Sequence, residues 1–101
     1  MTKYNKLIRD KIPDIIKQKG GTPVTHIATP DEYEKKLRDK LVEEVKEFLD
    51  SSNPEELADI MEVIYALSGR LGVDKKALED LRKRKADDRG GFEQGIILEE
   101  S

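Results

Sequence analysis

The sequence predicts a mainly α fold, an antiparallel helical bundle with a small two-stranded β ribbon. Apolar residues recur every three or four positions over two long segments between residues 30 and 71, as on one face of an amphipathic helix. Helix-start signals occur at Thr29-Pro30, at Asn53-Pro54 and at Asp74. Only the segments near residues 23–28 and 95–99 are strand-like, so we expect them to pair as the ribbon.

The amino-terminal part is expected to hold one short helix and the first strand. Proline is tolerated only near a helix start, so the helix should run from about Pro13 to Lys19, where two glycines stop it. The β-prone residues 24–27 lie between two prolines and form the strand. Residues far apart in the sequence would therefore meet in the ribbon.

Two long helices should follow as an antiparallel hairpin. Thr29 caps the first helix, Glu32 is placed to return the capping bond, and the helix should run to about Asp50. Asn53 caps the second, which should end at Gly72. Because the connection is so short, the two helices should lie side by side.

A fourth helix should begin after Asp74 and end near Gly90 and Gly91. It carries a basic run from Arg82 to Lys85. Cations in the last turns of a helix interact favourably with its dipole, and this role is the interpretation we favour for Arg82, Lys83 and Arg84.

The composition predicts one small domain with a thin core. The 101 residues are expected to form a single domain, 1–101, and a domain of this size buries roughly 60 to 70% of the surface that its unfolded chain exposes. Apolar residues make up 36% and charged residues 41%. Apolar helices with so little monomer core favour self-association, so we expect a homodimer or a higher homo-oligomer.

Charge and cysteine content exclude several classes of function. The net charge of −3 argues against general nucleic-acid binding, which needs a basic surface. Without cysteine, any metal must be held by oxygen ligands or by the single His26, to which we assign no catalytic role. No apolar segment is long enough for a signal peptide or a membrane span, so we expect a soluble cytoplasmic protein.

Glu44 is the residue that most constrains the function. It projects from the middle of an apolar helical stripe, with Glu47 at the edge of that stripe. A carboxylate that faces a core needs a cation, a proton or a metal ion, because an unpaired buried charge costs several kcal/mol. The stripe consists of Tyr33, Leu37, Leu41, Val45 and Phe48.

Glu56 and Asp59 form a second acidic pair near the start of the next helix. In an antiparallel hairpin this pair can converge with Glu44 and Glu47, and four carboxylates so close repel one another unless they share protons or a divalent cation. An all-oxygen set suits Mg²⁺, or Mn²⁺ in its place, and Mg²⁺ recruits phosphates for metal-assisted hydrolysis. The alternative is a solvated helix face with ion pairs, in which Lys40 and Lys46 balance Glu43 and Glu47.

Basic and aromatic residues near both ends could bind a nucleotide. The segments 5–11 and 85–92 carry cations suited to a triphosphate, and the Arg89-Gly-Gly turn could present backbone amides to an anion. Tyr4 and Phe92 could stack on a base, although a packing role suits each equally well.

These motifs together resemble a known superfamily. Glu44-x-x-Glu47 followed by Glu56-x-x-Asp59 resembles the signature of the MazG-like all-α nucleoside triphosphate pyrophosphohydrolases. The opening segment 4–13 and the closing pattern Lys85-x-x-x-Arg89-Gly-Gly-Phe resemble its small house-cleaning branch of noncanonical NTP pyrophosphatases, also described as phosphoribosyl-ATP pyrophosphohydrolase-like. The resemblance covers nearly the whole chain.

The resemblance implies Mg²⁺-dependent hydrolysis of a nucleoside triphosphate to monophosphate and pyrophosphate, in a homo-oligomer whose sites lie near the interface. It also implies metal binding by the four acids. Glu44 and Glu47 are the catalytic candidates, and Glu47 is our choice for the general base. The gap between the acidic pairs is shorter than in many members, which leaves the number of metals open. Phosphoribosyl-ATP hydrolysis and a noncatalytic helical nucleotide-binding or interaction module are the alternatives. The implied phosphate or nucleotide contacts are Lys6, Arg9, Lys11, Lys85 and Arg89.

Overall fold

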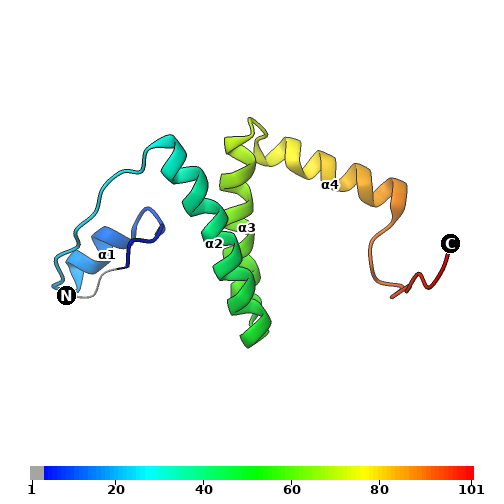
Figure 1. The fold of residues 1–101 in the computed structure, drawn as a ribbon, viewed down its shortest axis with the longest axis horizontal. Helices are drawn as coiled ribbons and strands as arrows, with labels where there is room; N and C mark the ends of the chain where they lie inside the picture. Colours follow the sequence, from blue (N-terminus) through cyan, green and yellow to red (C-terminus); the bar gives the residue numbers. More distant parts are fainter. Residues whose placement is uncertain (1–3) are drawn as a thin grey trace.

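Each long helix begins at the cap that the sequence supplies. The structure, a computed structural model, describes residues 4–101 and holds α1 (Ile12–Gln18), α2 (Pro30–Ser51), α3 (Pro54–Arg70) and α4 (Lys75–Arg89). Thr29 Oγ1 accepts a hydrogen bond from the Glu32 amide at 3.3 Å, and Asp74 Oδ1 accepts one from the Ala77 amide at 2.8 Å. The mainly helical part of the predicted fold is confirmed (Figure 1).

One detail of the predicted cap of α2 differs in the structure. The Glu32 carboxylate lies 3.0 Å from His26 Nε2 instead of turning back to the cap residue. This contact ties the segment before α2 to the first turn of that helix.

The predicted β ribbon is wrong. Neither residues 23–28 nor residues 95–99 form a strand, and no strand occurs anywhere in residues 4–101. Figure 1 shows the reason, because the two segments lie at opposite ends of the molecule and cannot pair. Val24 is 84% exposed and Ile97 is 82% exposed, so neither segment has a packed face, and an isolated two-stranded ribbon is only marginally stable in water.

The hairpin of α2 and α3 contains the buried centre of the chain. Ser52 adopts a left-handed backbone conformation (φ 54°) and ends α2, and the Asn53 side chain accepts a hydrogen bond from the Glu55 amide at 3.0 Å to start α3. Leu37 and Val63, one from each helix, are the buried apolar residues of the described part. The predicted antiparallel hairpin is therefore present, and its core is thin.

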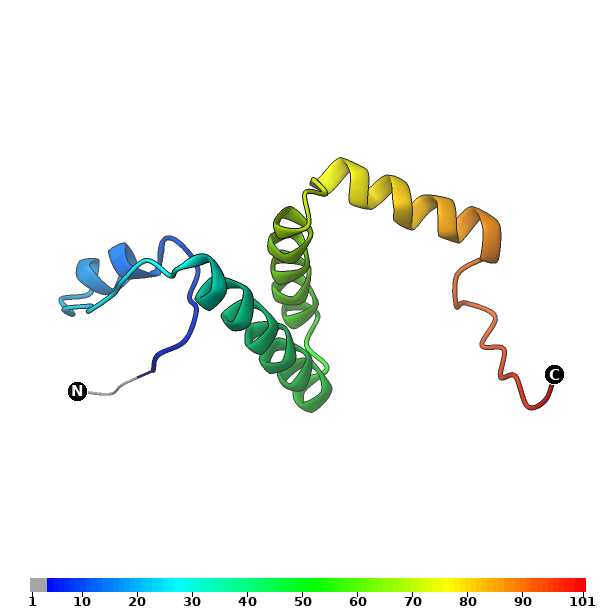
Figure 2. The ribbon, with the colours of Figure 1, turned by 45° about the horizontal axis from the view of Figure 1, so that its top comes forward.

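The remaining elements extend away from this hairpin. Ser68 donates a hydrogen bond to the Val73 carbonyl at 2.6 Å and fixes the turn into α4, which then projects outward (Figure 2). The chain measures 57 × 32 × 24 Å, with a radius of gyration of 17.6 Å, against about 13 Å for a compact domain of this length. Within residues 4–101, no helix is both long and apolar enough to cross a membrane.

The buried leucine predicts the largest stability loss. Leu37 is 2% exposed, and Leu37→Ala is expected to lower the free energy of unfolding by about 2 to 5 kcal/mol, because it leaves a cavity between the helices. Chemical denaturation measures the loss. The matched control, Val24→Ala in the exposed segment before α2, should change stability by less than about 0.5 kcal/mol.

A second prediction concerns Glu34 near the start of α2. Its carboxylate pairs with Arg38 on the same helix and with Arg70 at the end of α3. Hydrogen bonds from Arg38 and then from Arg70 lower the pKa of Glu34, so its charge stabilises the folded chain above the usual glutamate pKa of about 4.3. This contribution is lost as the pH falls through the lowered pKa. Glu34→Gln should therefore reduce Tm at pH 7, and the difference from the parent protein should disappear in strongly acidic buffer. A Tm difference independent of pH would contradict this assignment.

Candidate functional site

Glu44 lies buried between the helices, as its place on the apolar stripe of α2 predicts. The residue is only 6% exposed. Lys40, one turn earlier on α2, places its Nζ 3.2 Å from Glu44 Oε1. Glu44 Oε2 is buried and has no hydrogen-bond partner. Half of this carboxylate is therefore unsatisfied, which is unusual because buried polar atoms are normally paired.

Two groups of acids share Glu44. Carboxylate oxygens of Glu43, Glu44 and Glu47 lie within 4.8 Å of one another, and so do those of Glu44, Glu56 and Asp59. The first group lies on α2 alone, whereas the second joins α2 to α3. The hairpin thus brings together all four predicted metal ligands, with Glu44 at the centre. We call these five residues the acidic cluster.

The cluster changes the acidity of Glu47. Repulsion by the Glu44 carboxylate raises the pKa of Glu47 above its ordinary value. Desolvation, a hydrogen bond with Glu44 and repulsion by Glu56 and Glu43 raise the pKa further. Crowded negative charge therefore makes Glu47 a stronger base than a free glutamate.

Cations from the amino-terminal segment and from α2 surround the cluster. Arg9 Nη2 lies 2.7 Å from Asp59 Oδ1, and Lys6 Nζ lies 3.7 Å from Glu43 Oε1. Lys36 donates a hydrogen bond to the Asn5 carbonyl at 2.7 Å and holds this segment along α2. Two of the predicted phosphate contacts, Lys6 and Arg9, therefore lie beside the acids.

A small hollow opens between the amino-terminal segment and α2, next to the acidic cluster. Three lysine side chains and two carboxylates line it, so a ligand there would meet both positive and negative groups. The lining residues are Lys6, Leu7, Lys36, Asp39, Lys40 and Glu43.

Three other predicted contacts are not brought to the cluster. Lys11 lies just before α1, and Lys85 and Arg89 are exposed on α4, which extends away from the hairpin (Figure 1). Within residues 4–101, no ion pair joins any of the three to the acids of the cluster.

Lys40 is the site residue that the sequence pattern understated. Its side chain is only 18% exposed, and its Nζ lies within 4.0 Å of two acids, at 3.2 Å from Glu44 and 3.7 Å from Glu43. The spacing of four residues to Glu44 was the available signal. The lysine was expected only as part of a solvated face, and the 18% exposure of its side chain differs from that expectation.

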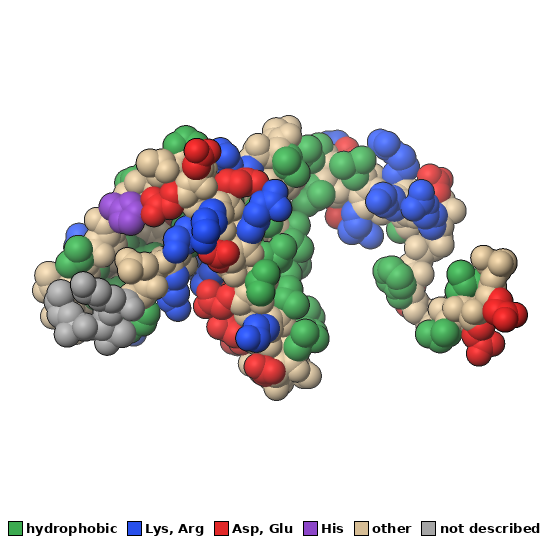
Figure 3. Space-filling view, in the orientation of Figure 1, with side chains coloured by type: hydrophobic (Ala, Val, Ile, Leu, Met, Phe, Trp, Pro, Cys, Tyr) green, Lys and Arg blue, Asp and Glu red, His purple; other side chains and the backbone are tan. Residues whose placement is uncertain are grey.

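Acidic and apolar side chains separate to different flanks of the hairpin. Figure 3 shows acidic atoms along one flank and hydrophobic atoms along the other.

Comparisons with known proteins do not identify a family. No family model matches the chain, and no solved structure matches it. A stretch of 42 residues, 42% of this chain, is 48% identical to an uncharacterized protein of Mycolicibacterium smegmatis. The match spans 43% of that protein, less than half of its length. The resemblance to MazG-like pyrophosphohydrolases thus remains a prediction from the motifs.

The crowding of the acids predicts how the substitution of Glu47 changes Tm in the absence and in the presence of metal. Because the folded state raises the pKa of Glu47, it binds protons more tightly than the unfolded state, and stability falls as the pH rises through the raised pKa. Glu47→Gln should therefore raise Tm at pH 7 in chelator-treated protein, and it should reduce the Tm gain on adding Mg²⁺. Differential scanning calorimetry measures both. Glu62→Gln, an exposed acid of α3 outside both acid groups, is the control and should change neither.

Proposed function

We propose that this chain is a Mg²⁺-dependent nucleoside triphosphate pyrophosphohydrolase that releases monophosphate and pyrophosphate. Noncanonical nucleotides are included among its substrates. The observation that carries the proposal is the buried, unpartnered Oε2 of Glu44 at the centre of the acidic cluster. A nucleotide substrate of this kind also implies a cytoplasmic protein.

The donor set fits a hard divalent cation. Glu44, Glu56 and Asp59 offer oxygens within 4.8 Å of one another from two helices, and neither histidine nor cysteine is among them. Mg²⁺ bound there would neutralise the polyphosphate charge and make water easier to deprotonate. It would also satisfy the oxygen of Glu44 that has no partner.

The nearby cations suit the phosphates of the substrate. Lys6 and Arg9 come from the amino-terminal segment and already lie beside the acids, at 3.7 Å from Glu43 and 2.7 Å from Asp59. Both side chains are about half exposed, so their ion pairs are weak and can be exchanged for phosphate oxygens. The lysine-lined hollow between this segment and α2 is the place we assign to the β and γ phosphates.

Glu47 is the general base in this proposal. It accepts a proton from the water that attacks the α phosphorus, while the bond from that phosphorus to the α–β bridging oxygen breaks and pyrophosphate leaves. Its raised pKa favours this role, because a base acts best when its pKa is close to the working pH. Glu47 is exposed, so a water molecule can reach it.

Phosphoribosyl-ATP is the alternative substrate, since it presents the same triphosphate chemistry to the same residues. Product analysis with that compound separates the two activities.

A noncatalytic helical interaction module is the second candidate function. The pairs of Lys40 with Glu44 and of Arg9 with Asp59 favour it, because they compensate part of the acidic charge without metal. A melting scan with Mg²⁺ and a nonhydrolysable triphosphate distinguishes the two candidates. A ligand present at 100 times its Kd stabilises the folded state by about 2.7 kcal/mol, and no rise in Tm would favour the module.

The test of the proposed function is a nucleotide panel with product identification by phosphorus NMR. Pyrophosphate and monophosphate should appear, without orthophosphate. Glu44→Gln keeps the size of the side chain and removes its charge, and it should reduce turnover by about 100-fold or more. Glu62→Gln should retain parent activity. Orthophosphate as the first product, or full activity of a folded Glu44→Gln protein, would overturn the proposal.

A further inference from the structure

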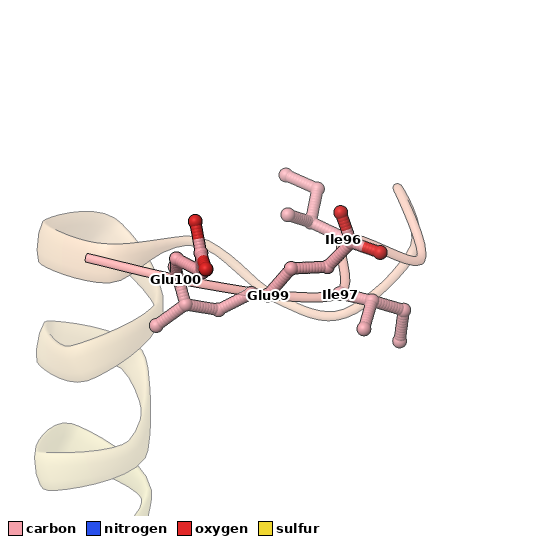
Figure 4. A pocket seen from close by; sticks show the side chains of 5 residues that line it. Ile96, Ile97, Glu99 and Glu100 are labelled. Atoms are coloured by element: carbon pink, nitrogen blue, oxygen red, sulfur yellow. The ribbon is translucent and has the colours of Figure 1, made fainter.

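The carboxyl-terminal part of the chain exposes large apolar side chains that no other segment of residues 4–101 covers. Phe92 is 96% exposed, and Ile96, Ile97 and Leu98 are each more than three-quarters exposed. Figure 4 shows the side chains of Ile96 and Ile97 on opposite sides of the extended backbone. The hollow in that view is lined only by the consecutive residues 96–100, so it follows from the curve of this segment. We call residues 75–98, which comprise α4 and this segment, the arm.

The hairpin has an exposed apolar face of its own. At about 100° per residue, the exposed apolar residues of α2 lie about 100° to 160° from Glu44, and those of α3 lie about 80° to 140° from Glu56. In the view of Figure 3, hydrophobic atoms gather along one side of the hairpin and acidic atoms along the other. This apolar face consists of Val42, Val45, Leu49, Leu57, Met61 and Ile64.

The chain exposes more surface than a compact folded monomer of the same mass. The chain exposes 9128 Å², whereas a folded monomer of 11.5 kDa exposes about 5,800 Å². For two chains this excess is about 6,600 Å² in total, against roughly 2,000 to 5,000 Å² that obligate partners commonly bury in total, so even a large interface would fit within it. Both the arm and the apolar face contribute to this excess, so each needs a covering surface.

Charge favours the arm over a second hairpin as the occupant of the apolar face. Helices α2 and α3 together carry twelve acidic and six basic side chains, whereas α4 carries seven basic and four acidic ones. Pairing two hairpins brings like net charges together, whereas pairing an arm with a hairpin brings opposite net charges together. The arm also projects from the hairpin and carries its apolar segment beyond the helix, where a second chain can meet it (Figure 2).

We propose that the arm of one chain packs on the apolar face of the hairpin of a second copy, with residues 92–98 on the stripe formed by Leu57, Met61 and Ile64. The partner is a second copy of this chain because the two exposed apolar surfaces and the two opposite net charges occur in the same molecule. The acids of the cluster are not among the residues of this contact.

The mass in solution is the first test. Light scattering on the full chain at micromolar concentration should give at least twice 11.5 kDa. Ile97→Asp in the arm and Met61→Asp in the apolar face should each reduce the mass to that of the monomer. Val24→Asp, an equally exposed position outside both surfaces, should leave it unchanged. A monomeric parent protein would overturn the proposal. So would an Ile97→Asp variant that keeps the mass of the parent assembly while the Met61→Asp variant dissociates.

Cross-linking tests the contact itself and does not depend on variants that could fail to fold. The chain has no cysteine, so Ile97→Cys and Met61→Cys can be made in separate chains, one of them tagged. After mixing, a short bismaleimide should join the two kinds of chain, whereas Lys17→Cys on α1 should not be joined to Ile97→Cys. If instead a dilute chain that carries both cysteines cross-links only within itself, the arm folds back on its own hairpin and the proposal is wrong.

Discussion

The carboxylate of Glu44 between α2 and α3 is the constraint on which the rest of the structure depends. A glutamate that is 6% exposed in the middle of a helix interface loses hydration that only charge or hydrogen bonds can replace. Lys40 compensates one oxygen, and the other has no partner. A leucine at this position would give a better-packed hairpin, so the sequence places a charge where stability alone would favour an apolar residue. Such departures from good packing are expected where a site is built.

The same constraint explains why the core is so small. Glu44 is buried like Leu37 and Val63, and it places a charged side chain where an apolar one would enlarge the core. The chain is left with a thin hairpin, an acidic flank and an apolar flank. Association through the apolar face would add packing that the thin hairpin lacks. If the arm packs on a second copy as proposed, self-association stabilises the fold. The acidic cluster then serves the proposed binding of metal and nucleotide.

The helices could be predicted from the sequence because their signals are local. Thr29, Asn53 and Asp74 cap the helices where they stand, and the three- and four-residue apolar spacing defines the faces. Local signals could not predict whether the ribbon forms, because strand pairing depends on where segments distant in the sequence lie in space. In the site, the convergence of the acidic pairs follows from the short connection of the hairpin. The partial burial of Lys40 and the distance of Lys85 and Arg89 from the acids depend on tertiary placement, which periodicity does not encode.

The cations around the cluster explain how so many acids coexist before any ligand is bound. Lys40 is largely buried, one turn from Glu44, and its pair is fixed by the helix. The pair of Arg9 with Asp59 joins an extended segment to α3 and is partly exposed, so it contributes at most about 1 kcal/mol. A cation held so weakly offsets part of the negative charge of the acids, yet can leave when a stronger partner arrives. A divalent metal bound at the acids would release Arg9 from Asp59, and a phosphate would then pair with Arg9. A phosphate bound at Arg9 would in turn free Asp59 for the metal, so the two ligands would bind together more tightly than either alone.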